Sequence, residues 1–122
     1  MAVSEDFLEF LRDQLRGLGH ITTRRMFSGA GIYCDSVIFA LLLRNVLHFK
    51  VDDSNRDAYE AERLEPFIYQ SRGKAVRMEA YRRVPERLFD DPDEMLEWAR
   101  GALAAGRRAA GSKKPKARKQ KP

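Results

Sequence analysis

The sequence has little of the residue types that disulfide frameworks and metal sites need. It contains one cysteine, Cys34, and two histidines, His20 and His48. A single cysteine cannot form a disulfide within the chain, so the scaffold of a small, disulfide-stapled secreted protein is excluded. Neither histidine has another His or Cys near it at the spacing of a zinc site. We therefore expect no bound metal, with both histidines at the surface or partly packed.

Long hydrophobic runs are also absent. The longest near-apolar run, 37–43, is far too short to span a bilayer. Residues 1–6 are acidic and lack the basic start and apolar stretch of a signal peptide. We expect a cytoplasmic protein without a membrane partner.

The C-terminal segment 107–122 lacks acidic residues and aromatic residues. All of its charges are positive, on Arg107, Arg108, Lys113, Lys114, Lys116, Arg118, Lys119 and Lys121. The whole chain has a net charge of +5, but without these eight residues 15 bases and 18 acids remain, a net charge of −3 for residues 1–106. The body is therefore not a basic nucleic-acid-binding domain. The segment itself could bind phosphates only without sequence preference.

Length and composition indicate one globular domain followed by a tail. The chain has 122 residues, of which 43% are hydrophobic, which suits a single domain with its own core. Beyond Gly106 the apolar pattern gives way to Ala, Gly, Lys, Arg and Pro. We expect a domain over residues 1–106 and a disordered basic tail over 107–122.

The hydrophobic pattern predicts an α+β fold with the order α-β-β-β-β-α-β-β-α. Ser4 is a good N-cap for a first helix, and Asp91-Pro92 is a typical start for the last one. We expect two layers, a sheet made of an antiparallel meander plus a hairpin, with helices packed on it. The predicted strands cover 22–28, 32–34, 37–43, 46–51, 67–70 and 75–81, with turns at 29–31, 35–36 and 44–45, and the middle helix covers 54–63 after Asp52 or Asp53 as its cap.

No constellation of catalytic residues is visible in the sequence. The paired acids at 52–53 and 90–91 precede predicted helices, where capping explains them. The glycines Gly29 and Gly31 fall between strands and not before a helix, so they do not form a phosphate-binding loop. A nucleophilic Cys34 would need a neighbouring base, and distance does not exclude His48, because strands two apart in a meander can meet. We expect a binding or regulatory module without a cofactor, and not an enzyme.

The segment Arg24-Arg25-Met26-Phe27 is a candidate contact site. In a strand, Arg24 and Met26 share one face, and Arg25 and Phe27 share the other. One interpretation is an arginine whose stem packs along the core edge. The other is a fixed guanidinium that binds a carboxylate or phosphate of a partner.

The stretch Arg25-Met26-Phe27-Ser28-Gly29-Ala30-Gly31-Ile32-Tyr33 resembles the signature of the TfoX (Sxy) N-terminal domain, found in bacterial regulators of competence genes. The similarity covers about residues 7–103, with Ser28 where the family usually has glycine and His48 where tyrosine is common. The longer regulators carry a second, helical domain, and here the basic tail stands in its place. Further matches follow in order at Phe39-Ala40, 47–52 with Lys50, Asn55, 66–69, Met78, Tyr81, Val84-Pro85, Leu96 and Trp98.

The resemblance implies a two-layer α+β fold and regulation of transcription together with a transcription factor of the cyclic-AMP receptor type. We therefore predict a regulatory module that acts through protein contacts, with Arg24, Arg25, Phe27, Gly29, Gly31 and Tyr33 as its contact residues. The alternative is a nucleic-acid-associated protein that binds DNA or RNA nonspecifically through the eight tail bases. The sequence also leaves a homodimer open as an alternative, because the edge strands of the predicted sheet need to be covered.

Overall fold

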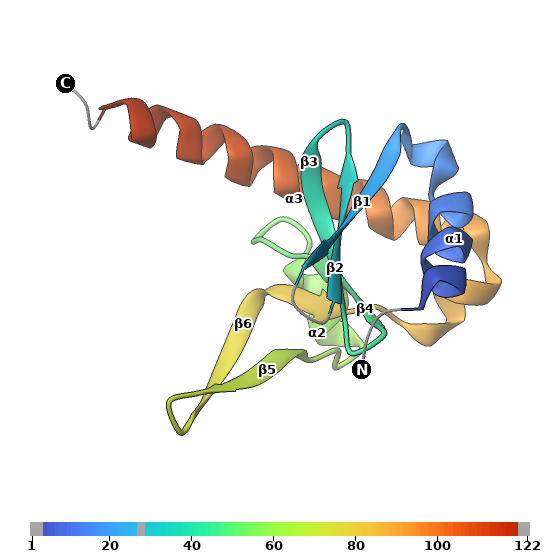
Figure 1. Cartoon of the computed structure of the whole chain (residues 1–122), viewed down its shortest axis with the longest axis horizontal. Helices are drawn as coiled ribbons and strands as arrows, with labels where there is room; N and C mark the ends of the chain where they lie inside the picture. The colour runs from blue at the N-terminus through green and yellow to red at the C-terminus, as the bar shows by residue number, and fades with distance from the viewer. Residues whose placement is uncertain (1–3, 27–28, 120–122) are drawn as a thin grey trace.

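The computed structural model describes the backbone of residues 4–26 and 29–119, and the side chains of 4–26 and 29–111. Over this part of the chain the fold is α+β, with a six-stranded antiparallel sheet and three α-helices in the predicted order (Figure 1). The elements are α1 (Glu5–Gln14), β1 (Ile21–Met26), β2 (Gly29–Cys34), β3 (Val37–Leu43), β4 (Val46–Lys50), α2 (Arg56–Ala61), β5 (Pro66–Ser71), β6 (Lys74–Arg83) and α3 (Pro92–Lys119), with 3₁₀ turns η1 (Arg16–Leu18) and η2 (Glu86–Asp90).

The strand order in the sheet is β1-β2-β3-β4-β6-β5, and every neighbouring pair is antiparallel. The first four strands form the predicted meander, and the β5–β6 hairpin joins it through β6. The tight turns at Asp35–Ser36 and Arg44–Asn45 have positive φ at both residues, 49° and 72° in the first and 54° and 64° in the second. Such turns match the right-handed twist of the strands that they connect. In Figure 1 the hairpin projects from the body of the molecule.

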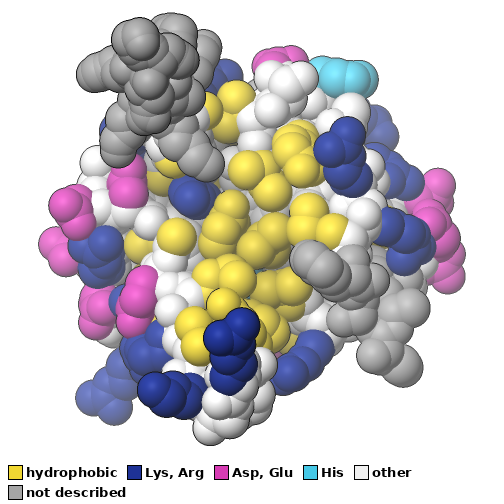
Figure 2. All heavy atoms as spheres, turned by 60° about the vertical axis from the view of Figure 1, so that its left-hand side comes forward, with side chains coloured by type: hydrophobic (Ala, Val, Ile, Leu, Met, Phe, Trp, Pro, Cys, Tyr) yellow, Lys and Arg dark blue, Asp and Glu magenta, His cyan; other side chains and the backbone are white. Residues whose placement is uncertain are grey.

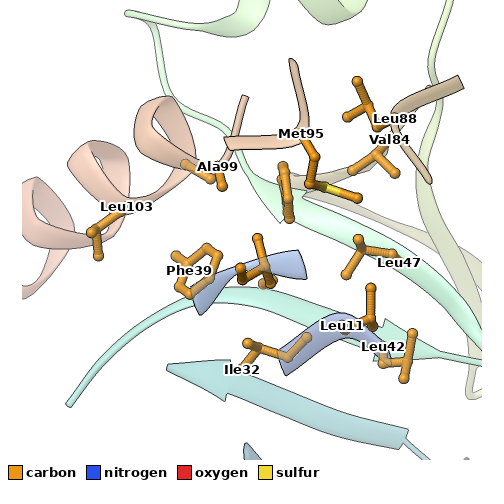
Figure 3. Close-up of a cluster of buried hydrophobic side chains, with 14 of the residues drawn as sticks. Leu11, Ile32, Phe39, Leu42, Leu47, Val84, Leu88, Met95, Ala99 and Leu103 are labelled. Atoms are coloured by element: carbon orange, nitrogen blue, oxygen red, sulfur yellow. The ribbon is translucent and has the colours of Figure 1, made fainter. Parts of the chain in front are cut away.

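Helices α1 and α3 pack on one face of the sheet and enclose the hydrophobic core (Figure 3). A β-bulge enlarges this core, because Ile32 pairs with Ala40 while Tyr33 pairs with Ile38, which leaves Phe39 as an extra residue on the core side. Much of this core comes from α1, α3 and the strands β2, β3 and β4. Its deeply buried side chains include Leu8, Leu11, Ile32, Phe39, Leu42, Leu47, Phe49, Met95 and Ala99, together with Leu15 directly after α1.

The turn predicted at residues 29–31 is wrong, because β2 already begins at Gly29. Glycine is required here for close packing. A Cβ at Gly29 would collide with the carbonyl oxygen of Leu42, and one at Gly31 would lie 2.9 Å from Cε of Met26. The predicted end of the first strand, 27–28, lies outside the described residues.

The middle helix is shorter than predicted, and its N-cap is Asn55 and not Asp52 or Asp53. Asp52 instead organises the turn before the helix. Its carboxylate accepts a hydrogen bond from the backbone N–H of Ser54, at 3.0 Å, and its own N–H donates to the side chain of Asn55, at 2.8 Å.

The last helix begins as predicted, since the carboxylate of Asp91 accepts a hydrogen bond from the N–H of Glu94 at 3.1 Å. It does not end at Gly106 and continues to Lys119. Gly106 is buried against β3, where an added Cβ would lie 2.5 Å from the carbonyl oxygen of Ile38. The glycine therefore permits close helix–sheet contact and is not a helix stop. None of the helices in the described segments is long and apolar enough to cross a membrane.

Candidate protein-interaction surface

The sheet has a second face, which we call the outer face, on the side opposite α1 and the core. Because residues paired across antiparallel strands point to the same side, the register assigns its members. They are Thr22, Arg24, Met26, Gly29, Gly31, Tyr33, Ile38, Leu41, Leu43, Val46, His48, Lys50, Tyr81 and Arg83. Figure 2 shows a continuous hydrophobic area here, with lysines and arginines on its borders.

The centre of the outer face lies over Gly31. A Cβ at this position would lie within 3.2 Å of side-chain atoms of Met26, Ile38 and Tyr33, so these three side chains converge above the glycine. The lack of a side chain at Gly31 lets them form a shared apolar floor. Towards the hairpin, Phe67 extends this floor, with its ring 5.5 Å from that of His48.

Positive side chains lie over the aromatic rings of the outer face. Arg24 lies 6.0 Å from the ring centre of Tyr33, and Lys50 lies 4.9 Å from that of Tyr81. Arg44, in the β3–β4 turn, lies 5.3 Å from the ring of Phe67. Cations at such distances are attracted to the ring faces, which holds them at the edge of the apolar floor.

Three arginines at this border, Arg24, Arg44 and Arg83, have no carboxylate within ion-pair distance in the described part of the chain. Several arginines elsewhere are paired, whereas exposed ones such as Arg63, Arg72 and Arg100 also have no carboxylate partner in the described part of the chain. Arg87, for example, donates to both Glu62 and Glu94 at 2.7–3.0 Å. The three border guanidiniums can therefore accept a carboxylate from another molecule without breaking an ion pair in this one.

The outer face is hollowed on both sides of its centre. Beside the hairpin lies a hollow of about 280 Å³, lined among others by Arg44, His48, Phe67, Arg83 and one carboxylate, Glu65. On the other side Tyr33, Ile38 and Lys50 line a hollow of about 370 Å³ together with Ala109 and Ala110 of α3. The face is thus a shallow trough and not a flat plane.

The predicted contact residues divide between the two faces of the sheet. Arg24, Gly29, Gly31 and Tyr33 lie on the outer face. Arg25 points the other way and forms an ion pair with Glu5 of α1 at 2.6 Å, which lowers the pKa of that carboxyl group. Phe27 lies outside the described residues.

The basic C-terminal residues also differ in their surroundings. Arg107 is exposed, whereas Arg108 donates two hydrogen bonds to the carboxylate of Asp52, at 2.6 and 2.9 Å. This pair lowers the pKa of Asp52 and fixes α3 against the turn before α2. The remaining tail bases lie outside the described side chains, and they are Lys113, Lys114, Lys116, Arg118, Lys119 and Lys121.

Sequence inspection missed Arg44, Phe67 and Arg83 as members of this surface. Arg44 occupies a turn, and the other two belong to the hairpin strands, so only the strand order β4-β6-β5 places them beside β3 and β4. Lys50 did carry a signal in the sequence, since the period of two along 46–51 places it on the same strand face as Val46 and His48.

Cys34 and His48 lie on opposite faces of the sheet. Cys34 is completely buried on the core side, where burial and then the Asp35 carboxylate raise the pKa of its thiol. His48 is 4% exposed on the outer side, its Nδ1 is 2.9 Å from the carbonyl oxygen of Val46, and burial lowers its pKa. The sheet therefore separates the thiol from this imidazole.

Comparison with known proteins identifies the family. No curated protein matches the chain. The sequence profile of the TfoX N-terminal domain matches residues 13–106, which is most of the chain and includes all six strands. This chain belongs to the TfoX N-terminal domain family.

Proposed function

We propose that the chain is a regulatory module that acts in transcription by binding a protein partner through the outer face of its sheet, without catalysing a reaction. The observation that carries the proposal is an apolar floor bordered by three arginines that have no ion pair within the described part of the chain. Apolar patches of this kind, rimmed by polar groups, mark interaction sites on protein surfaces.

The environments of Cys34 and His48 support a role without catalysis. A thiol is activated by nearby positive charge or a base, and Cys34 instead has a carboxylate beside it. The ring of His48 packs against that of Phe67, and its Nδ1 lies within hydrogen-bond distance of the carbonyl oxygen of Val46. Both residues therefore fit a structural role in the sheet.

Membership of the family makes a transcription factor of the cyclic-AMP receptor type the first partner to examine, and competence genes the first targets. The acidic body, with its net charge of −3 over residues 1–106, is unsuited to binding DNA directly. A module of this charge is better suited to contacting a protein that is itself bound at a promoter.

The test is to compare transcripts in cells that produce the wild-type chain or the variant Val46→Asp. Val46 is 36% exposed at the edge of the apolar floor, so the substitution adds charge there with little effect on the core. The matched control is Phe10→Asp, at a 42% exposed position on α1. We expect a defined set of transcripts to change with the wild type and with the control, and to return to the level of empty cells with Val46→Asp. Unchanged transcripts with the wild-type chain would refute the regulatory role.

A further inference from the structure

We infer that the occupant of the outer face is an acidic amphipathic helix of a partner protein. This inference rests on the proposed function and adds the chemistry of the partner. The starting point is that β3 is apolar on both faces: Leu42 points into the core and Leu41 points to the outer face, and both are buried. Sheets with two apolar faces are normally covered by helices on both sides.

The described helices cover one side only. α1 and the first part of α3 lie against the core face, whereas the continuation of α3 passes the edge of the outer face at Ala109 and Ala110 (Figure 1). The outer face thus has the apolar floor of an interior layer but lacks the helix that completes such a layer. A helix that presents an apolar stripe to this floor would complete it.

The charges around the apolar floor indicate which kind of helix would bind there. Arg24, Arg44, Lys50 and Arg83 border the floor, although the body as a whole carries net negative charge. Such a local reversal of sign attracts acidic groups and repels basic ones. Glu65 lies in the hollow beside Arg44 and Arg83, so the bases outnumber the acids at this border.

Charge also argues against a second copy of this chain as the occupant. In a two-fold symmetric dimer the same patch meets itself, so both halves of the interface carry the same excess of positive charge and neither supplies an excess of acids to pair with it. Two surfaces with the same sign of charge repel each other, which disfavours this association. An acidic helix from a different protein meets no such penalty.

The test uses a defined probe, a fluorescein-labelled peptide of about 18 residues, long enough to form a helix in water. Leucines occupy one helical face and glutamates flank them. One control peptide carries lysine in place of each glutamate, and a second has the same composition with the leucines dispersed around the helix. Fluorescence anisotropy is measured with the full-length chain over a series of salt concentrations.

We expect saturable binding of the acidic amphipathic peptide that weakens as salt is added, and at least tenfold weaker binding of both controls. Arg24→Glu and Arg83→Glu should each weaken binding of the acidic peptide about tenfold, while Arg100→Glu, an exposed position on α3, should leave it unchanged. Equal binding of the acidic and lysine peptides, or no saturable binding, would overturn the inference.

Two further outcomes separate this inference from the proposed function. If Val46→Asp abolishes the transcript response while Arg24→Glu and Arg83→Glu leave it intact, the outer face binds a partner that is not acidic, and only the inference fails. If sedimentation shows that the chain dimerises and Val46→Asp makes it monomeric, the occupant is a second copy, and the inference is likewise wrong.

Discussion

Gly106 and Gly111 are both in α3, but their surroundings differ. A Cβ at Gly106 would lie 2.5 Å from the carbonyl oxygen of Ile38, while a Cβ at Gly111 would meet no described atom within 4 Å outside its own helical turn. The same residue type therefore serves close packing at one position and faces open space among the described residues at the other. Glycine inside an exposed helix costs about 1 kcal/mol relative to alanine, whereas glycine at a tight contact cannot be replaced without a shift of backbone.

Gly106→Ala is expected to lower the free energy of unfolding by about 1–3 kcal/mol, because the methyl group forces α3 away from β3. Gly111→Ala is the matched control and is expected to leave stability equal or raise it by up to about 1 kcal/mol. Urea denaturation followed by circular dichroism measures both. Equal effects of the two substitutions would contradict the close helix–sheet contact at Ile38.

His48 gives the protein a pH-dependent stability. Its pKa is lowered from the ordinary value of 6.5, mainly by burial, and the Arg83 guanidinium contributes in the same direction. The unfolded chain therefore binds a proton at a pH where the folded chain does not, so the free energy of unfolding falls as the pH drops through about 6.5.

The variant His48→Phe should remove this dependence between about pH 7.5 and 5.5, in which the wild type loses at most about 1.4 kcal/mol per pH unit. The lowered pKa values of carboxyl groups such as Asp52 and Glu62 act at lower pH, because these groups start from ordinary values of 3.8 and 4.5. Urea denaturation at a series of pH values provides the measurement, with His20→Gln as control. A wild-type dependence that persists in His48→Phe would show that another group causes it.

At the scale of elements, the β5–β6 hairpin depends on one buried arginine. Arg82 is 6% exposed on the core side of β6, where it donates to the carbonyl oxygen of Leu64 at 3.1 Å and pairs with Glu60 at 2.9 Å and Glu79 at 3.2 Å. These contacts connect the base of the hairpin to α2 and to the segment that precedes β5. Beyond this base the hairpin strands are largely exposed.

Arg82→Ala is expected to lower the free energy of unfolding by about 1–3 kcal/mol, because the carbonyl of Leu64 loses its buried donor. The cost stays below that of an isolated buried charge, since both carboxylates remain partly exposed to water. Hydrogen exchange should quicken first in β5 and β6. The control Arg77→Ala removes an exposed ion pair to Glu79 and should change stability by less than about 1 kcal/mol. Uniform exchange across the whole sheet in Arg82→Ala would contradict a local role.

Elements with a strong local pattern could be predicted from the sequence, and those fixed by tertiary packing could not. The apolar run of β3 and the Asp91-Pro92 start of α3 are found in the structure at the predicted residues. The pattern predicted a turn at Gly29 and Gly31 and the start of the tail just after Gly106. It could not indicate the close packing at these glycines, because the chain that packs against each of them is distant in sequence. For the same reason Arg24 and Tyr33 could be proposed from one strand pair, whereas Arg44, Phe67 and Arg83 could not.

At the scale of the whole molecule, charge is distributed unevenly. The body is acidic, the border of the outer face is basic, and the C-terminal segment carries eight bases, one of which, Arg108, is already paired with Asp52. The outer face and the C-terminal segment are therefore two regions of positive charge, and they adjoin at Ala109 and Ala110 of α3. The first combines charge with an apolar floor, which is why we assign it the protein partner.

The role of the C-terminal segment can be tested separately with labelled duplex DNA. We expect the full chain to bind weakly, with a log–log salt slope no steeper than about −6, as the seven remaining bases allow. A chain that ends at residue 111 should not bind. Sequence-specific binding that survives this truncation would favour the body as a DNA-binding domain.

Contact between the outer face and a transcription protein can be captured in cells by site-specific photo-crosslinking. A benzoylphenylalanine is placed at Ile38, half-buried on the outer face, or at Phe10 on α1 as the control. We expect position 38 to crosslink to a protein of the transcription machinery and position 10 not to do so, and we expect Val46→Asp to abolish the crosslink. A crosslink to that machinery from position 10 but not from position 38 would contradict this contact.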